Sequence, residues 1–500
     1  MSENQQLKLL VIGIDGASFT VFDRLIKKGI LPNFEKLKKQ SSFGPLQATF
    51  PPHTAPGWPS MFNGVEPGEH GIYQFWSTKV DDYEPVSMNA SDSTREPTWH
   101  VLERFGYKVG VYNVPMTHPP TDLKDGYMIS WPLSTTLRYT SPPGLMRELM
   151  KENLHYHSDI VTMYRGQKDY SEQASVFMDG RTKTCKYLQA THPVDALFVV
   201  YTEVDRVSHY YWGENEEPSA AVEQCYQEMD ESLGHLLELA NEQTLVIVSS
   251  DHGFGLCESD FNVHELLEQH GLLSTKYVPT SSDDKEVQDD ASLHPWFEST
   301  INYKRVIDWD NTYFYMPTPG CFGLNMNLKG REKSGCLNES EIGHYFSMLQ
   351  QAISSYKDEN DESLFQVVRS SEIYKGISVD QAPDFILLPK TFSVMPTPSL
   401  TGSITSKPSQ SGVHYPDGAL FVSGSTFPKD SQLFARIEDV HPLILAHLNV
   451  PVPQPIDGHW LVEPPFEVKR EAYHENTHGR SLNDEESRFL NKQLKEIGYL

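Results

Sequence analysis

Three short apolar segments of the chain each lead into an aspartate, and this arrangement limits the possible folds more than any other feature of the sequence. The segments are LLVIGI (9–14), ALFVVYTE (196–203) and TLVIVSSD (244–251), and the carboxylates are Asp15, Asp205 and Asp251. Continuous apolar runs of this length are typical of strands that are buried on both faces of a sheet.

Amphipathic segments separate these apolar runs. Residues 22–40 (FDRLIKKGILPNFEKLKKQ) and 220–240 (AAVEQCYQEMDESLGHLLELA) carry apolar side chains at helical spacing, and we predict one helix over each. Strands that alternate with helices predict an α/β fold, with a mostly parallel central sheet flanked by helices. Ligands bind such sheets at the carboxyl ends of the strands.

A polar segment interrupts the alternation after the third strand. Residues 275–292 are acidic and rich in turn-forming residues, which is typical of a surface loop. Short strand-like runs and one helical segment (339–356) then predict an inserted α+β cap, and core-type runs return at GALFVSG (418–424) and DVHPLILAHLNVPVP (439–453). The predicted parts are a first core part at 1–270, the inserted cap at 271–395, a second core part at 396–465, and a C-terminal tail or surface helix at 466–500.

The charge of the chain disfavours one class of partner. Lys and Arg total 41 against 68 Asp and Glu, and the net charge of −27 would repel the phosphate backbone of DNA or RNA. We therefore expect no nucleic-acid polymer as a partner. A small anionic substrate remains compatible with this charge, because bound divalent cations can invert the local field.

The N-terminal residues, the lack of long apolar runs and the cysteines indicate a cellular compartment. The N-terminal residues MSENQQLK are polar and lead straight into an apolar strand, without the basic and long apolar regions of a secretion signal. No apolar run approaches the roughly 18 residues that a membrane span needs. The five cysteines form no CxxC pair, which is typical of buried thiols in a reducing compartment. We expect a cytoplasmic protein without a membrane partner, and the sequence leaves the oligomeric state open.

Histidines accompany the aspartates. Asp15 lies in GIDG, Asp205 and His209 in TEVDRVSH, Asp251 and His252 in SSDHG, and His414 in SGVHYPDG. Carboxylate oxygen and neutral imidazole nitrogen are ligands that Zn²⁺ prefers, and two divalent ions about 4 Å apart need about this many ligands. An isolated D-x-x-x-H or DHG is far more often a helix pair or an N-cap. Because all the motifs fall at predicted strand ends of one sheet, the set predicts a centre of two divalent ions, with Zn²⁺ expected and Mn²⁺ the alternative.

The stretch TFPPHTAPGWPSMFNGVEPGEHGI supplies a candidate nucleophile, Thr54. Pro51 and Pro52 favour an extended approach to it, a helix is predicted to begin there, and Asn63-Gly64 is a typical helix end. A threonine at a helix start is more often only an N-cap. Beside a metal centre, the same position would also place the hydroxyl on a metal, which lowers its pKa, and a backbone N–H where it can bind a phosphate oxygen.

Together these motifs resemble the type I phosphodiesterase/nucleotide pyrophosphatase branch of the alkaline phosphatase superfamily, and especially its bacterial members. The resemblance covers roughly residues 8–465 and rests on blocks in the family's order: GIDG, PPHTAPGWPSMFNGVEPGEHGI, VGVYNVPMTHPP, D-x-x-x-H, SDHG, NLKGRE, GVHYPDG and DVHPLILAHLNVPVPQPIDG. It implies an alkaline phosphatase-like fold with a cap inserted before the last ligand.

The resemblance also implies a role for each candidate residue. One metal would be held by Asp15, Thr54, Asp251 and His252, and the other by Asp205, His209 and His414. Thr54 would be the nucleophile. Two departures limit the transfer: Gln74 stands in the stretch where the family carries a phosphate-binding asparagine, so a preference for nucleotides is not implied, and the secretion signal of many members is missing.

Other polar residues near these motifs have competing structural interpretations. His53 and His70 neighbour the nucleophile, but His70 is favoured as a packing residue between a helix and a strand rather than as a ligand. Asn113 and Arg331 could face the substrate, although a structural hydrogen bond or a surface ion pair is at least as well supported. We leave all four out of the predicted site.

The predicted function is hydrolysis of a small phosphate ester, most specifically a phosphodiester, through a phosphothreonine at Thr54. The alternatives are a phosphomonoesterase or phosphotransferase of the same superfamily, and a catalytically inactive binding or scaffold relative. The complete ligand set disfavours the inactive relative. Sulfatases are disfavoured because no C/S-x-P-x-R motif follows Asp15.

Preference for a diester is predicted from aromatic residues around the motifs: Trp58, Phe75, Trp76, Tyr210, Tyr211 and Trp212. No arginine adjoins Thr54, and Arg206, next to a predicted ligand, is expected to point away. A rim that is aromatic and poor in charge suits a bulky organic substituent better than a phosphate dianion. The alternative is that these rings pack the sheet against the cap.

Overall fold

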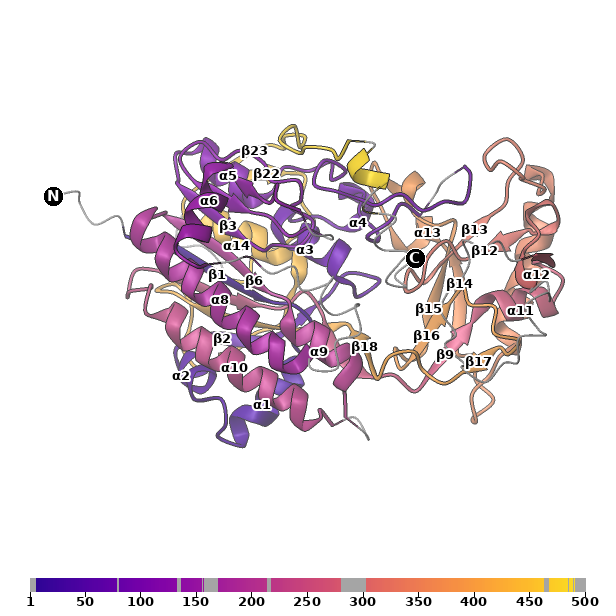
Figure 1. Ribbon diagram of the computed structural model, residues 1–500, viewed down its shortest axis with the longest axis horizontal. Helices are drawn as coiled ribbons and strands as arrows, with labels where there is room; N and C mark the ends of the chain where they lie inside the picture. Colours follow the sequence, from indigo (N-terminus) through magenta and orange to yellow (C-terminus); the bar gives the residue numbers. More distant parts are fainter. Residues whose placement is uncertain are drawn as a thin grey trace, which may run out of the picture.

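A ten-stranded sheet forms the larger of two lobes (Figure 1). The computed structural model describes residues 6–78, 81–132, 136–154, 156, 170–213, 217–279, 303–462, 467–483, 485–488 and 490. The sheet consists of β1 (Leu9–Ile14), β2 (Ser42–Gln47), β3 (Val109–Tyr112), β4 (Tyr127–Ile129), β5 (Thr140–Ser141), β6 (Ala196–Tyr201), β7 (Leu245–Ser249), β19 (Asp417–Ser423), β20 (Ser431–Gln432) and β21 (Ala435–Arg436).

The strand order is β20-β2-β19-β7-β1-β6-β3-β4-β5, with β21 also beside β2. β1 runs parallel to β6 and β7, and β3 runs parallel to β6 and β4. β19 and β5 run antiparallel to their neighbours. The predicted α/β fold with a mostly parallel sheet is confirmed, and the three predicted strands are β1, β6 and β7 at its centre.

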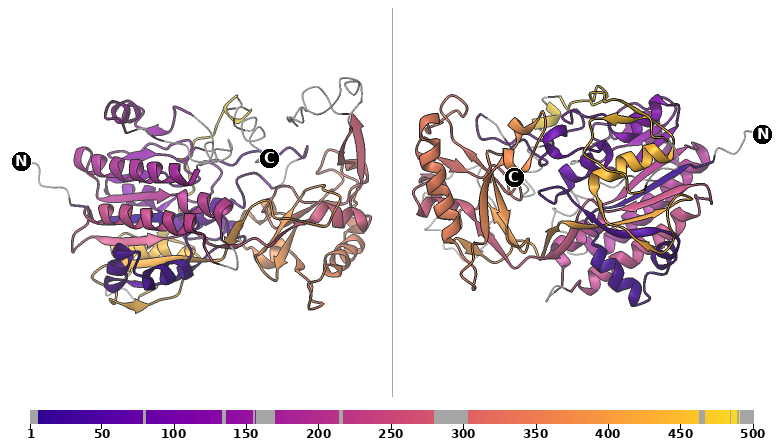
Figure 2. Two further views of the ribbon diagram at one scale, coloured as in Figure 1. Left: turned by 60° about the horizontal axis from the view of Figure 1, so that its bottom comes forward. Right: turned by 180° about the vertical axis from the view of Figure 1, so that it is seen from behind.

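Helices cover both faces of the sheet. One face carries α1 (Phe19–Lys27), α2 (Pro32–Gln40), α6 (Gly144–Lys151), α8 (Tyr170–Thr191) and α10 (Ala220–Leu237); the other carries α3 (Thr54–Asn63), α5 (Thr98–Arg104) and α14 (Val440–His447). The view from behind in Figure 2 shows α14, in gold, on the face opposite to α8 and α10. Alternate residues of β1 enter the two cores, Leu10 and Ile12 on one side and Leu9 and Val11 on the other, as the two-residue period of a strand requires. Within the described residues, no helix has the length and apolarity needed to cross a bilayer.

Residues 22–40, predicted as one helix, form the end of α1 and the whole of α2. The chain turns between them at Gly29, whose φ of +74° lies in the left-handed region, and α2 begins at Pro32. Glycine adopts this conformation without strain, and proline at the first helical position loses no hydrogen bond. These two residues therefore divide a segment whose apolar period continues across the break.

The smaller lobe, described residues 259–406, has its own core. Its sheets contain β9 (Ser259–Asn262), β16 (Val394–Thr397) and β17 (Thr405–Ser406); β12 (Phe314–Tyr315), β13 (Gly323–Met326), β14 (Phe365–Arg369) and β15 (Phe385–Pro389); and β10 (Thr275–Pro279) with β11 (Tyr303–Ile307). Its helices are α11 (Val263–Gln269), α12 (Ile342–Ser355) and α13 (Ser370–Ile373), with 3₁₀ turns at Trp309–Asn311, Glu339–Glu341 and Val379–Gln381. Phe261, Phe314 and Phe385 lie in this core. The predicted domain boundaries, including the cap at 271–395, stay a prediction.

Two segments connect the lobes. An antiparallel ribbon of β8 (Gly253–Leu256) and β18 (Gly412–Tyr415) lies at their junction, where Figure 1 labels β18. The segment after α4 (Pro67–His70) also reaches the small lobe, where Tyr83 stacks on Trp309 with the ring centroids 3.7 Å apart. The site described below lies at this junction.

Two other segments differ from their sequence-based description. The predicted loop at 275–292 begins as strand β10, which pairs with β11, and its residues from 280 onward lie outside the described residues. Residues 439–453 form α14 and part of β22 (Val452–Gln454) rather than a core strand, after a 3₁₀ turn at Ile437–Asp439. In the C-terminal segment, β23 (Arg470–Ala472) pairs with β22.

Candidate active site

The carboxyl ends of β1 and β7 bring the first two carboxylates together. Asp15 follows β1 directly, and Asp251 lies two residues beyond β7. The N–H of Gly16 donates a hydrogen bond of 3.3 Å to Asp251 Oδ1. Gly16 has a φ of +70°, and a Cβ there would lie 2.9 Å from the Cα of Asp205. Glycine at this position therefore lets a third carboxylate approach the other two.

Asp205 and His209 lie on α9 (Glu203–Tyr211), which begins two residues after β6. The sequence pattern placed them at a strand end, whereas they occupy the first turns of the helix that follows. Residues four apart share a helix face, and His209 Nε2 lies 3.5 Å from Asp205 Oδ2. The D-x-x-x-H spacing thus presents both side chains to the same side.

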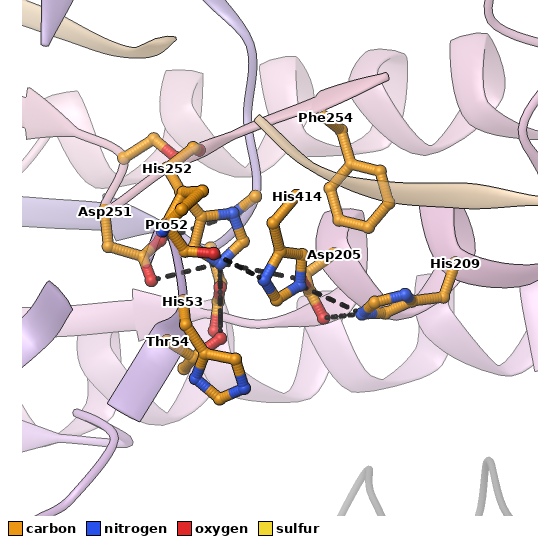
Figure 3. Close-up of polar contacts among 12 residues, drawn as sticks. Pro52, His53, Thr54, Asp205, His209, Asp251, His252, Phe254 and His414 are labelled. Atoms are coloured by element: carbon orange, nitrogen blue, oxygen red, sulfur yellow. Dashed lines mark hydrogen bonds and ion pairs between the residues drawn. The ribbon is translucent and has the colours of Figure 1, made fainter. Parts of the chain in front are cut away.

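His414 reaches the site through the β8–β18 ribbon. Its register places His414 opposite Phe254, two residues after His252. The imidazole rings of His414 and His252 stack with centroids 3.8 Å apart. His414 Nε2 lies 3.1 Å from Asp205 Oδ1 and 3.1 Å from His209 Nε2 (Figure 3). A residue remote in sequence is therefore brought against the ends of β6 and β7.

Thr54 is the first residue of α3, but it is not the N-cap. His53 is the N-cap, and its Nδ1 accepts a 3.1 Å hydrogen bond from the N–H of Ala55. The hydroxyl of Thr54 instead donates to Asp15 Oδ1 at 3.2 Å. It also lies 3.3 Å from His252 Nε2 (Figure 3). The predicted helix start is confirmed, and the capping interpretation of Thr54 is wrong.

The seven residues predicted from the sequence therefore lie together at one edge of the sheet. They form two groups of possible ligands, Asp15, Asp251 and His252 in one and Asp205, His209 and His414 in the other, with Thr54 beside the first. Within each group the donor atoms lie within 4.8 Å of one another. These groups are two candidate metal sites, and the role of each residue as a ligand stays a prediction.

The carboxylates of the site repel one another. Burial, followed by the charges of Asp251 and Asp205, raises the pKa of Asp15 well above its usual value. Burial and the charge of Asp205 raise the pKa of Asp251 to about 8. Burial acts in the same direction on Asp205, but His209 and Arg206 outweigh it and the pKa of Asp205 falls well below its usual range. A cation between these groups would relieve the repulsion.

Burial favours the neutral form of two of the imidazoles, and backbone carbonyls orient two of them. Burial lowers the pKa of His209 to about 4 and that of His252 well below its usual value. His414 Nδ1 lies 3.1 Å from the carbonyl oxygen of Pro52, and His252 Nδ1 lies 3.1 Å from that of Gly253. With each Nδ1–H donating to a carbonyl, the Nε2 lone pair faces the centre. These carbonyls could not be predicted from the sequence, because a backbone oxygen has no residue signature.

The hydrogen-bond partners of the polar atoms in the site indicate whether a metal ion fits there. Asp15 Oδ2 and Asp251 Oδ2 are buried and have no hydrogen-bond partner among the described residues. Buried carboxylate oxygens without partners are costly, and divalent cations satisfy them. Two groups of three oxygen and nitrogen donors match the ligand types and numbers of zinc sites that retain an open position. The residues present therefore fit a binuclear metal centre.

A cavity of about 370 Å³ opens beside Thr54, His209 and His414. Phe75, Trp76 and Tyr210 line it. The other aromatic residues singled out from the sequence pack elsewhere: Trp58 in one core of the large lobe, and Tyr211 and Trp212 against the other. Both interpretations of the aromatic residues therefore apply, and Phe75 and Trp76 fit both, because they also pack in a buried cluster with Trp131.

Arg206 also lines this cavity, although its side chain was expected from the sequence to point away. It is buried in the first turn of α9, its Nη1 contacts the carboxylate of Asp205, and its guanidinium lies 5.8 Å from the Trp131 ring centroid. On a helix, adjacent residues lie about 100° apart, so Arg206 can face the cavity while Asp205 faces the metal sites.

Two of the residues left out of the predicted site, His70 and Asn113, form hydrogen bonds within the fold. His70 Nε2 lies 2.8 Å from Ser60 Oγ, and its Nδ1 accepts from the N–H of Ile72, as a packing residue would. Asn113 Nδ2 donates to Val200 O at 2.9 Å.

Arg331 and Gln74 also have partners of their own. Arg331 forms an ion pair with Asp384, with 2.7 Å between Nη2 and Oδ2. Gln74 lines the cavity, where its Nε2 donates to Pro319 O at 3.3 Å and its Oε1 accepts from the N–H of Phe75. Its amide therefore ties the large lobe to the small one.

Solved structures share this fold. Mouse ectonucleotide pyrophosphatase/phosphodiesterase 5, as an inactive variant in complex with AMP, aligns with a TM-score of 0.54 and 15% sequence identity over 91% of this chain and 98% of its own. The human protein gives 0.52 and 14% over 90% and 97%. Phosphonoacetate hydrolase from Sinorhizobium meliloti 1021, in complex with phosphonoacetate, gives 0.56 and 13% over 87% and 94%. At these identities the likeness shows the fold alone, and it confirms the alkaline phosphatase-like architecture.

The sequence itself matches a known family over most of its length. No curated protein matches the chain. The family described as type I phosphodiesterase/nucleotide pyrophosphatase matches residues 9–414, a span that includes all seven candidate residues. The chain belongs to the type I phosphodiesterase/nucleotide pyrophosphatase family of the alkaline phosphatase superfamily.

Proposed function

We propose that the protein hydrolyses a small phosphodiester through a covalent phosphothreonine at Thr54. The observation that carries this proposal is the position of the Thr54 hydroxyl. It does not cap its helix, and it lies between Asp15 and His252 at a cavity large enough for an organic substituent. The AMP bound by the mouse structural neighbour is a phosphate ester of suitable size and supports this substrate class.

Two Zn²⁺ ions are the proposed cofactors. Asp15, Asp251 and His252, with Thr54, would hold one, and Asp205, His209 and His414 would hold the other. When bound, they would supply positive charge that stabilises the phosphoryl oxygens and lowers the pKa of the attacking hydroxyl. The low pKa of His209 keeps this imidazole available as a ligand at neutral pH.

The residues of the chain position the reacting groups. The Thr54 oxygen attacks phosphorus, the bond from phosphorus to one ester oxygen breaks, and the alcohol leaves with a proton. Water then attacks the phosphothreonine, which restores the Thr54 hydroxyl and releases a phosphate monoester. Asp15 Oδ1 accepts the Thr54 hydrogen bond and so fixes the direction of the hydroxyl. Arg206, on the cavity wall, would contribute positive charge near the phosphoryl group.

Arg206 also favours the second candidate function, a phosphomonoesterase. A guanidinium in the cavity is the group that would pair with the extra negative charge of a monoester dianion. The aromatic side chains of the cavity favour the diester, because they can contact a second substituent on phosphorus. We call these side chains, Phe75, Trp76 and Tyr210, the aromatic wall.

The test uses purified protein that has been stripped by a chelator and reloaded with Zn²⁺ or Mn²⁺. We expect kcat/KM for bis(nitrophenyl) phosphate to exceed that for nitrophenyl phosphate. A monoester preference of about 100-fold, equivalent to about 2.7 kcal/mol of transition-state stabilisation, would instead establish the monoesterase function. Absence of hydrolysis of both esters would contradict either function.

A further inference from the structure

The cavity beside Thr54 has a polar patch on the side of the small lobe. The patch is formed by β9, β16 and the segments that follow β16 and β17, next to β18 in Figure 1. Its polar members are Asp260, Thr397, Ser399, Ser409 and Gln410, and we call them the polar wall. The aromatic side chains of the large lobe lie on the same cavity. A ligand there meets rings on one side and hydrogen-bonding groups on the other.

The direction of Asp260 follows from strand alternation. Successive residues of a strand point to opposite faces. Phe261 of β9 lies in the core of the small lobe, and Asp260, directly before it, lines the cavity. Its neighbour in the register of β16 is Met395, which lines the cavity as well.

One oxygen of Asp260 lacks a partner. The side chain is 6% exposed, and its Oδ2 accepts a 3.0 Å hydrogen bond from the N–H of Ser409. Oδ1 is buried and has no hydrogen-bond partner among the described residues. Burial raises the pKa of this carboxyl, against the effect of its hydrogen bonds from Ser409. A buried carboxylate oxygen without a partner is costly, and a ligand in the cavity can supply the missing donor.

The neighbours of Asp260 indicate which donor fits. Hydroxyl and amide side chains, such as those of Ser399, Ser409 and Gln410, both donate and accept hydrogen bonds. A hydroxyl group of the ligand also does both, so it can donate to Asp260 and accept from a neighbour. An ammonium group only donates, and it would leave the donors of the polar wall without acceptors.

We propose that Asp260 determines substrate specificity by accepting a hydrogen bond from a hydroxyl group on the organic substituent of the phosphodiester, so that the substrate carries a polyol or a sugar. This inference rests on the proposed diesterase function. Asp260 acts on binding and orientation of the substituent, whereas Thr54 acts on phosphorus. Loss of the hydrogen bond therefore lowers discrimination between substituents without abolishing the reaction.

The test compares three nitrophenyl phosphodiesters under Zn²⁺, in which the second substituent is glyceryl, propyl or aminoethyl. We expect the wild-type protein to hydrolyse the glyceryl ester with a kcat/KM at least about tenfold above that of the propyl ester, the range for a hydrogen bond to a charged group. Asp260→Asn should reduce this ratio to less than about threefold, mainly through a lower kcat/KM for the glyceryl ester. The amide oxygen can still accept from Ser409, but the amide nitrogen replaces Oδ1, the acceptor that lacks a partner among the described residues.

Glu258→Ala is the matched control. Glu258 lies two residues before Asp260, and its Oε2 also accepts a hydrogen bond from a serine, Ser393, at 2.6 Å, but it is not among the described residues that line the cavity. Its substitution should leave the ratio unchanged. Circular dichroism of Asp260→Asn against wild type checks the fold.

Each outcome decides the inference. A glyceryl preference that disappears in Asp260→Asn supports it. Equal rates for glyceryl and propyl esters, or a preference that survives Asp260→Asn, would overturn it and leave the diesterase function standing. Preference for the aminoethyl ester that depends on Asp260 would overturn the assignment of a hydroxyl group. Failure to hydrolyse any of the three diesters would overturn the proposed function together with the inference.

Discussion

The hydroxyl of Thr54 has no structural task at the helix start, because His53 caps α3. We therefore expect Thr54→Ala to fold and to bind metal while kcat falls by about three orders of magnitude or more, as for loss of other nucleophiles. Thr54→Ser, which keeps a hydroxyl, should retain part of the rate. Mass spectrometry of acid-quenched wild-type protein should find phosphate on Thr54. A near-normal rate for the alanine variant would mean that water attacks phosphorus directly.

The pKa of Glu438, a residue outside the candidate site, gives a second prediction at the residue scale. Its side chain is 3% exposed, and burial, opposed by the charge of Arg436, raises its pKa to about 7. A raised carboxyl pKa means that the folded state binds the proton more tightly. This contribution to stability is complete below the ordinary pKa of 4.5 and is lost as the pH rises through about 7.

Glu438→Gln keeps the shape of the protonated acid at every pH. From pH 4.5 to pH 8, the free energy of unfolding of the variant should rise relative to that of wild type by about 3 kcal/mol, measured by urea denaturation at both pH values. Glu359→Gln, on the exposed surface of the small lobe, controls for removal of one acidic side chain. A difference between variant and wild type that does not change with pH would contradict the raised pKa.

At the residue scale, the chemistry of side chains was predictable and their orientation was not. Asp15, Asp205 and Asp251 could be predicted because a carboxylate at the end of a buried strand is costly unless it binds a ligand or a cation. The direction of Arg206 depends on the helical rotation of α9, and the free oxygen of Asp260 depends on how β9 pairs with β16. Neither the direction of Arg206 nor the missing partner of Asp260 can be predicted from the neighbouring residues in the sequence.

The packing of α3 on β1 positions the nucleophile at the scale of elements. Trp58 of α3 lies against Gly13, where a Cβ would be 2.4 Å from the Trp58 Cη2 atom. Gly13→Ala should therefore push α3 away from the sheet and reduce the free energy of unfolding by about 1–3 kcal/mol, the usual range for overpacking. It should also lower kcat, because Thr54 moves with its helix.

Gly180→Ala is the matched control for this substitution. Gly180 lies within α8, where no neighbouring atom of the described chain lies within 4 Å of the position that an alanine methyl group would take. Alanine there should stabilise the protein by about 0.5–1 kcal/mol through helix propensity. Urea denaturation of both variants gives the comparison. Equal stability of Gly13→Ala and wild type would show that α3 can repack without loss.

Elements with one continuous hydrophobic pattern could be predicted from the sequence. Elements that end at a glycine or proline within such a pattern could not. The runs that form β1, β6 and β7 are apolar throughout, so tertiary contacts reinforce their local preference. The break between α1 and α2 depends on Gly29 and Pro32, two residues within a continuous apolar pattern. The helical start of α9 was missed because Thr202 and Glu203 continue directly from the apolar run of β6. Thr202 with Asp205 three residues later is nevertheless a pattern typical of a helix start.

For the whole molecule, the sequence indicated an insertion but not how it closes the site. The polar wall and the aromatic wall include residues more than 100 positions apart, such as Tyr210 and Thr397. Their meeting depends on the β8–β18 ribbon and on contacts such as Tyr83 with Trp309. Such long-range pairings are set by tertiary packing, which is why the cavity could be described only from the structure.

The placement of charge across the central sheet gives the last prediction. Asp15, Asp205 and Asp251 gather at the carboxyl ends of the strands, whereas Asp195, directly before β6, lies at the amino end, where Lys8 pairs with it at 3.1 Å. Without ions, the carboxyl-end carboxylates repel one another in a buried site. Ion binding to the folded state should therefore offset this repulsion, whereas Asp195 already has its partner.

Zn²⁺ should stabilise the folded protein by about 2.7 kcal/mol for each site at an ion concentration about 100 times the dissociation constant. Denaturation with Zn²⁺ and with a chelator measures this gain. Asp195→Asn, compared with its own metal-free state, should keep the full gain. Asp251→Asn should lose the gain of the one site that Asp251 would help to hold, about half of the total. Its metal-free form should be at least as stable as metal-free wild type, because one of the repelling carboxylates is gone. An equal gain in all three proteins would place the ions elsewhere and contradict the two-metal site.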